Sequence, residues 1–225
     1  MSDLAVVCGA SGGLGPAVAT LFAQRGERVA AVASPRRRRE QLERLVPRVT
    51  WDQADLTDRV RTEQLWERID GLGGRVRWLV NITGGYRAGR TLDTDEDDYR
   101  YLLRLNLDSC WWACREGARR IAAGGGGGIV NISARQAQEG GVGSAAYAVA
   151  KAAVLKLSQV LAAELKSELV RVNALLPSLI DTPANRAERS PESMRRAVSP
   201  VAVAGVIGWL CSEQSAAVTG AAVTI

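Results

Sequence analysis

The chain has 225 residues, enough for one sizeable hydrophobic core and too few for two ordinary domains. Hydrophobic residues make up 47% and charged residues 24%, and no apolar run approaches the roughly 18 residues that span a bilayer. The modest net charge of +5 and a short arginine run at 36–39 without interleaved aromatic residues favour a solvated surface over a nucleic-acid site. These features argue against membrane and nucleic-acid partners.

Two further properties of the composition narrow the class of protein. The N-terminus lacks the basic region of a signal peptide, so we expect a cytoplasmic protein. The four cysteines form no C-x-x-C pair and the chain has no histidine, which predicts buried, reduced thiols and no metal site.

Strand-like and helix-like segments alternate from one end to the other, as in a doubly wound parallel sheet. The predicted order is strand 4–8, helix 16–25, strand 28–33, helix 37–45, strand 49–51, helix 57–70, strand 76–80, helix 95–123, strand 128–133, helix 143–165, strand 170–175, helix 201–211 and strand 221–225. The polar, proline-punctuated segment 182–200 predicts a mobile loop with short helices over a substrate site. With no repeat and no linker, we expect a single-domain, Rossmann-like α/β fold over residues 1–225, with about seven strands and helices on both faces.

A glycine-rich turn joins the first strand to the first helix. Gly9, Gly13 and Gly15 have the spacing G-x-x-x-G-x-G, which lets the chain turn tightly and lets its backbone approach a pyrophosphate. The free N–H groups at the start of the following helix attract phosphate. The segment therefore predicts a dinucleotide site formed by Gly9, Ser11, Gly12, Gly13, Leu14 and Gly15.

A tyrosine and a lysine stand four residues apart near the start of the helix predicted at 143–165. Tyr147 and Lys151 form Y-x-x-x-K, and this spacing places both on one helical face. A nearby ammonium favours the phenolate and lowers the pKa of a tyrosine, which makes Tyr147 a candidate proton donor to a carbonyl that receives hydride.

The glycine turn and the Y-x-x-x-K pair together resemble the short-chain dehydrogenase/reductase family, although Cys8 stands where that family has threonine. The resemblance implies that Tyr147 is the general acid, that Lys151 orients the nicotinamide ribose, and that Asn106 holds a water of a proton relay. It also implies cofactor contacts from three further segments. These contribute Asp55 and Leu56; Asn81, Ile82, Thr83 and Gly84; and Pro177, Ile180 and Thr182.

One position departs from the family pattern. Counting back from Tyr147, the place of the family's catalytic serine is Ala134, and the adjacent Ser133 should point to the opposite face of its strand unless a bulge redirects it. Three explanations stay open: an activated substrate, another donor, or a protein that binds cofactor without turnover. The donors that could stand in are Gln136, Ser144 and Tyr86.

The first explanation has a precedent within the wider superfamily. The segments 81–86 and 181–186, with Ala134, resemble dihydropteridine reductases, which lack the serine and reduce a quinonoid pterin. An enzyme of that kind is one alternative to a carbonyl or quinone reductase. The third explanation, a non-catalytic NADP-binding regulator, is the other.

The end of the second predicted strand bears on the choice of nicotinamide. NAD-preferring members have an acid there, but this chain has Ala33 and Ser34, and Ser34, Arg36 and Arg37 suit a 2′-phosphate. We therefore expect NADP(H) to be preferred, with NAD(H) possible, and a small molecule as substrate. The resemblance also implies a homodimer or homotetramer through the two long helices, where Trp111 and Trp112 are candidate contacts.

Overall fold

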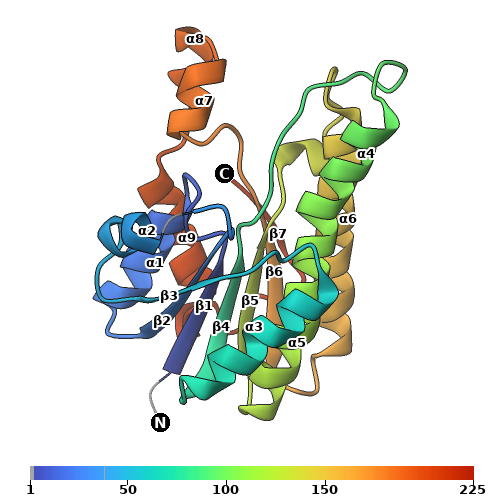
Figure 1. Cartoon of the computed structure of the whole chain (residues 1–225). Coiled ribbons are helices and arrows are strands. Elements are labelled where there is room, and N and C mark those ends of the chain that lie inside the picture. The colour runs from blue at the N-terminus through green and yellow to red at the C-terminus, as the bar shows by residue number, and fades with distance from the viewer. Residues whose placement is uncertain (1–2, 38) are drawn as a thin grey trace.

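The computed structural model describes residues 3–37 and 39–225, which form a seven-stranded parallel sheet in the order β3-β2-β1-β4-β5-β6-β7 (Figure 1). The strands are β1 Asp3–Cys8, β2 Arg28–Ala33, β3 Thr50–Gln53, β4 Arg75–Asn81, β5 Gly127–Ile132, β6 Val170–Leu176 and β7 Ala222–Thr224. Their side chains are mostly buried because helices cover both faces of the sheet. The predicted doubly wound α/β fold is confirmed.

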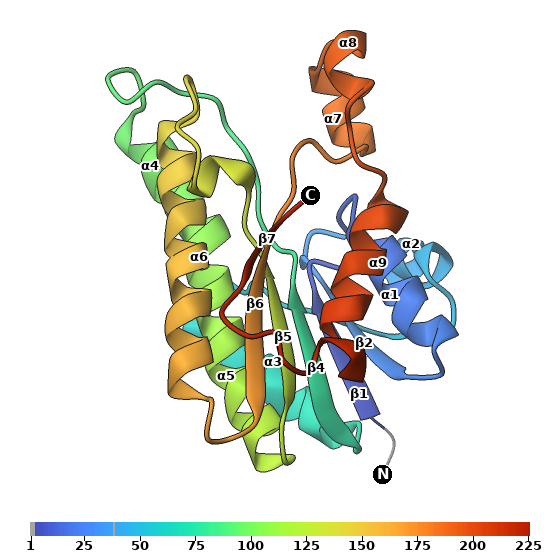
Figure 2. The same cartoon turned by 180° about the vertical axis from the view of Figure 1, so that it is seen from behind.

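The helices divide into two groups, one for each face of the sheet (Figures 1 and 2). On one face lie α1 Gly15–Gln24, α2 Arg39–Leu45 and α9 Pro200–Leu210. On the other lie α3 Arg59–Gly71, α4 Glu96–Leu103, α5 Ser109–Ala123 and α6 Ala145–Glu164. Two short helices, α7 Pro183–Glu188 and α8 Pro191–Met194, rise above the carboxyl edge of the sheet as an arm, where the sequence predicted a loop with short helices.

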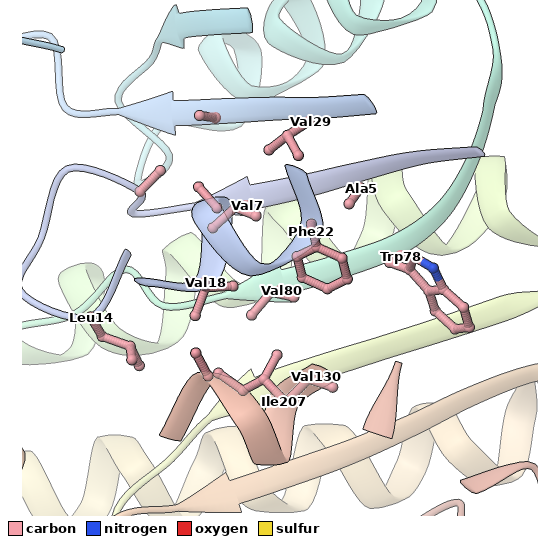
Figure 3. Packing of buried hydrophobic residues seen from close by; sticks show 14 of the residues in the cluster. Ala5, Val7, Leu14, Val18, Phe22, Val29, Trp78, Val80, Val130 and Ile207 are labelled. Atoms are coloured by element: carbon pink, nitrogen blue, oxygen red, sulfur yellow. The ribbon is translucent and has the colours of Figure 1, made fainter. Parts of the chain in front are cut away.

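Alternation along the central strands builds a hydrophobic core on each face. Figure 3 shows Phe22 of α1 and Ile207 of α9 packed with Val7, Val80 and Val130, which point to the same side of three neighbouring strands. The intervening residues, such as Val6, face α3 and α5. Each fully buried side chain of this size stabilises the fold by about 1.5–3 kcal/mol.

Helix α6 is long and apolar enough to cross a membrane, the only such helix within 3–37 and 39–225. In the fold it lies along β6, and Ala150, Val154 and Leu155 are buried on that side. This packing against the sheet accounts for part of its apolar composition, and other apolar residues of α6 stay exposed.

Two predicted elements differ from the structure. The helix expected over 95–123 is interrupted by a π-helical turn, η1 Arg104–Asp108, between α4 and α5. The helix expected from residue 37 begins at Arg39, and residues 35–37 form a turn after β2. Cys8, Cys110, Cys114 and Cys211 are free and buried, as predicted.

Candidate active site

A cleft of about 710 Å³ opens at the carboxyl edge of the sheet, between the glycine turn, the start of α6 and the arm formed by α7 and α8. In the strand order, β1 and β4 are neighbours whose connections run to opposite sides, and ligands of such sheets bind outside the carboxyl ends of the strands at this point. Many of the predicted site residues line the cleft: Leu14, Ile82, Gly84, Asn106, Tyr147, Lys151, Pro177 and Ile180.

The glycine turn is packed so closely that side chains would collide. Gly9 has φ +84°, and a Cβ there would lie 2.6 Å from the backbone nitrogen of Thr83. A Cβ on Gly13 would lie 2.5 Å from Cγ2 of Thr182. Helix α1 then begins at Gly15 with no side-chain cap, so its first N–H groups are open to a phosphate. The structure thus brings the glycine turn, Thr83 and Thr182 together.

Lys151 lies beneath the cleft with its ammonium held by backbone. The side chain is buried, and Nζ donates a hydrogen bond of 2.8 Å to the carbonyl of Ile132, the last residue of β5. Burial lowers the pKa of Lys151 to about 8.

The pKa of Tyr147 differs from the value that the sequence predicts. Nζ of Lys151 lies 5.9 Å from the centroid of the Tyr147 ring, and the pKa of Tyr147 is raised to about 12, chiefly by burial and further by Tyr86. The predicted lowering of this pKa by the lysine is wrong for the chain alone, because removal of the phenol from water outweighs an ammonium at this distance.

Asn106 occupies the π-helical turn and fixes the loop after β4. Its Oδ1 accepts a hydrogen bond from the N–H of Gly85 at 3.2 Å, and its Nδ2 donates to the carbonyls of Gly85 and Leu102, each at 3.0 Å. A Cβ on Gly84 would lie 2.6 Å from the same Oδ1. Asn106 therefore positions the backbone at 84–85 beside Lys151.

The strand β5 has no bulge that would turn the hydroxyl of Ser133 to the side of Ala134. Its pairing with β6 runs without a shift in register from Gly127 to Ile132. Ser133 and Ala134 both line the cleft, but the hydroxyl of Ser133 donates its hydrogen to the carbonyl of Lys151 at 2.7 Å, and Ala134 offers only a methyl group. The predicted orientation of Ser133 is confirmed.

A second group of predicted residues lies beyond the lining of the cleft, at the ends of β2 and β3. Ser34, Arg36 and Arg37 are exposed in the turn after β2. The amide of Gln53 donates to the carbonyls of Ser34 and Arg37 at 3.1 and 2.6 Å. Gln53 thereby fixes the shape of this turn, a role that the sequence did not indicate.

Three predicted cofactor contacts have their side chains engaged elsewhere. The amide of Asn81 donates to Asn131 and to Cys114 beneath the sheet. Leu56 is buried in the core, and the carboxylate of Asp55 accepts two hydrogen bonds from Thr57. The side chain of Asn81 belongs to a buried polar network and that of Leu56 to hydrophobic packing, so neither faces a ligand.

Sequence reasoning placed the arm over the substrate site but assigned no role to Arg189. Arg189 lines the cleft, and its guanidinium lies 4.9 Å from the ring centroid of Tyr86. Tyr86 in turn packs edge-on against Tyr147, with the ring centroids 5.1 Å apart. No motif marks Arg189, because the contact depends on how the arm folds back over the sheet.

Comparison with known proteins agrees with this geometry. A family model described as enoyl-(acyl carrier protein) reductase matches residues 9–225. A solved short-chain type dehydrogenase/reductase from Mycobacterium ulcerans superimposes with a TM-score of 0.91 at 26% identity, covering 100% of this chain and 88% of the other. The chain belongs to the short-chain dehydrogenase/reductase family.

Two curated relatives of this short-chain dehydrogenase/reductase are similar over nearly their whole length. The 3-oxoacyl-[acyl-carrier-protein] reductase of Thermotoga maritima is 30% identical, with 98% of this chain and 94% of the relative covered. The (3R)-3-hydroxyacyl-CoA dehydrogenase of Rattus norvegicus is 30% identical, with 100% and 95% covered. The protein is accordingly an NAD(P)-dependent oxidoreductase.

The residues present fit the cofactor of a short-chain dehydrogenase/reductase. A Cβ on Gly13 would collide with Thr182, so the turn presents bare backbone here, and the uncapped start of α1 offers N–H donors beside it. The hydroxyl oxygen Oγ1 of Thr83 is buried with no partner among the residues described. An uncapped helix start and a bare backbone suit a pyrophosphate.

Proposed function

We propose that this chain, as one domain over residues 1–225, is an NADPH-dependent reductase of a carbonyl or quinone-like small molecule. The observation that carries the proposal is the meeting of Tyr147, Lys151 and Asn106 with the open start of α1 around one cleft. An acid, a buried cation and a phosphate-binding turn in one place are what carbonyl reduction by a nicotinamide requires.

In this mechanism Tyr147 is the general acid. The reduced nicotinamide, when bound, supplies the hydride that adds to the carbonyl carbon. The hydroxyl of Tyr147, which a pKa of about 12 keeps protonated at neutral pH, donates its proton to the carbonyl oxygen. Lys151, charged below about pH 8, stabilises the negative charge that develops on the Tyr147 oxygen and holds the ribose hydroxyls. Asn106 holds the loop after β4 against the nicotinamide and, in addition, a water of the proton relay.

The preference for NADPH rests on the turn after β2. Arg36 and Arg37 are exposed there and form no ion pair with any residue within 3–37 or 39–225, so both guanidinium groups are available to a 2′-phosphate. No carboxylate ends β2 to bind a free ribose hydroxyl. Ser34 contributes a hydroxyl in the same turn.

We further propose a homodimer or homotetramer formed through α5 and α6. Trp111 on α5 is 49% exposed and Val149 on α6 is 57% exposed, while Trp112 is only partly exposed. Large apolar side chains left on neighbouring long helices suit contact with a second copy.

The test is oxidation of NADPH and of NADH by the purified protein against 2,3-butanedione, a quinone and quinonoid dihydropterin. We expect turnover with NADPH that falls at least 10²-fold in Tyr147→Phe, while the NADPH affinity stays unchanged. The double variant Arg36→Ser/Arg37→Ser should raise the KM for NADPH about tenfold or more and leave that for NADH unchanged.

Two outcomes would replace the proposal. Turnover with NADH and the pterin alone would indicate a dihydropteridine-reductase-like enzyme, which the alanine at 134 favours. Tight NADPH binding with no turnover of any acceptor would indicate a non-catalytic regulator.

A further inference from the structure

The cleft needs a second hydrogen-bond donor beside Tyr147. As hydride adds to a carbonyl, negative charge develops on the oxygen, and one well-placed donor changes the rate by roughly 10²–10³. Ala134, at the position where the family places a serine, presents only a methyl group to the cleft. The donor must therefore come from another element.

Most of the nearby polar side chains already use their donor hydrogens. Ser133 donates to the carbonyl of Lys151 at 2.7 Å, and Ser144 donates to the carbonyl of Gly141 at 3.2 Å. The amide of Asn106 donates to two backbone carbonyls. Turning any of these groups toward a substrate would leave a backbone carbonyl without a partner.

Tyr86 is held beside Tyr147 and has a hydroxyl that can turn. The two rings meet edge-on, with centroids 5.1 Å apart and an interplanar angle of 77°. The hydroxyl of Tyr86 reaches only the carbonyl of Gly143, at 3.4 Å, which is at the long limit of a hydrogen bond, and the side chain is 37% exposed. Redirecting this hydroxyl to a substrate oxygen costs little.

The arm strengthens Tyr86 as a donor. The guanidinium of Arg189 lies 4.9 Å from the centroid of the Tyr86 ring. A cation over the ring stabilises electron density that shifts onto the phenol as it donates a hydrogen bond. A phenol is in any case more acidic than a serine hydroxyl and so is the better donor to a developing oxyanion.

We propose that Tyr86 is a second catalytic donor, which hydrogen-bonds the substrate oxygen in the role left open at Ala134. The inference rests on the proposed reductase function. The carbonyl carbon gains the hydride of NADPH, the electron pair of the C=O π bond moves onto oxygen, and that oxygen takes the proton of Tyr147. Tyr86 keeps its own proton and stabilises the charge while it passes.

The decisive variant is Tyr86→Phe, which removes the hydroxyl and keeps the ring contacts with Tyr147 and Arg189. With NADPH and the best acceptor among 2,3-butanedione, ethyl acetoacetate and a quinone, we expect kcat to fall about 10²-fold. The affinity for NADPH, measured by calorimetry, should stay unchanged, and so should the melting temperature. Adding Ala134→Ser to Tyr86→Phe should recover at least tenfold of the lost kcat, because a serine there again offers a donor to the cleft.

Tyr99→Phe is the matched control, since Tyr99 is 46% exposed on α4 and does not line the cleft. The inference is overturned if Tyr86→Phe keeps kcat within twofold, or if Gln136→Ala causes the loss instead. A reductase that loses its rate in Tyr147→Phe but not in Tyr86→Phe would overturn only the role of Tyr86. The proposed function itself would be overturned if the wild-type protein oxidised NADPH with none of these acceptors, or if Tyr147→Phe were fully active.

Discussion

At the scale of single residues, burial sets the charge of the groups that matter. Every Y-x-x-x-K motif contains a tyrosine and a lysine, and the motif does not indicate their pKa values. Here the pKa of Lys151 is about 8 and that of Tyr147 about 12, because both side chains are buried. The two shifts move a cation toward neutrality and keep an acid protonated. Such effects follow from packing, so the sequence indicates the groups but not their charge.

Glu27, at the opposite edge of the sheet, is a half-buried acid. Its Oε2 is buried without a hydrogen-bond partner, and burial raises its pKa from 4.5 to about 7, opposed chiefly by Arg25. Between these pH values the folded chain keeps a proton that the unfolded chain has released, so stability should fall as pH rises through this window. The effect is at most about 3 kcal/mol, and less because part of the group stays solvated.

Urea unfolding at pH 5 and pH 7.5 checks this expectation. The wild-type chain should lose more free energy of unfolding between the two values than Glu27→Gln, which cannot ionise. Glu43→Gln on α2 controls for the change in net charge. If the wild type and Glu27→Gln lost the same free energy of unfolding between the two pH values, this carboxyl would not govern the pH dependence.

At the scale of elements, the π-helical turn η1 couples helix geometry to the cleft. Asn106→Ala should lower the free energy of unfolding by about 2–4 kcal/mol, because it strips three backbone groups of hydrogen bonds, one on Leu102 and two on Gly85. Freed of this anchor, the loop after β4 should also bind NADPH more weakly. Chemical denaturation and calorimetry measure the two effects.

Ser109→Ala gives a matched comparison in the same helix. Ser109 donates a hydrogen bond of 2.6 Å to the carbonyl of Leu105, one turn earlier, and does not touch the loop after β4. Its loss should cost about 1 kcal/mol and leave NADPH binding unchanged. If both variants behaved alike, Asn106 would serve the helix alone.

The same turn shows what could be predicted from sequence. Period and glycine punctuation located the strands and helices, since these signals are local. The π-helical turn was not predicted, because the side chain of Asn106 competes for the carbonyl of Leu102 only once the loop at 84–85 lies beside it. Spacing indicated the glycine turn and the pair Tyr147 and Lys151, and the family resemblance implied most of the other site residues. The inward side chain of Asn81 and the contact of Arg189 with Tyr86 depend on packing between distant segments.

At the scale of the whole molecule, the helices of the two faces differ in what they leave exposed. The helices α4 and α5 follow one another end to end beside α6 on one face (Figure 1), and Trp111 on α5 and Val149 and Val160 on α6 are each more than 40% exposed. On the other face, α9 exposes Trp209 at 39%. An interface between copies formed through α5 and α6 would cover the first set and leave Trp209 in solvent.

Light scattering after size exclusion separates these possibilities. Trp111→Glu places a charge where the proposed interface excludes water and should shift the protein toward the monomer, raising the dissociation constant at least tenfold. Trp209→Glu makes the same chemical change on α9 and should leave the mass unchanged. A wild-type monomer at all concentrations, or a shift caused by Trp209→Glu alone, would place the contact elsewhere. Helix α6 also carries Tyr147 and Lys151. Loss of the proposed interface between copies should therefore lower turnover together with the molecular mass measured by light scattering, which would link assembly to the cleft.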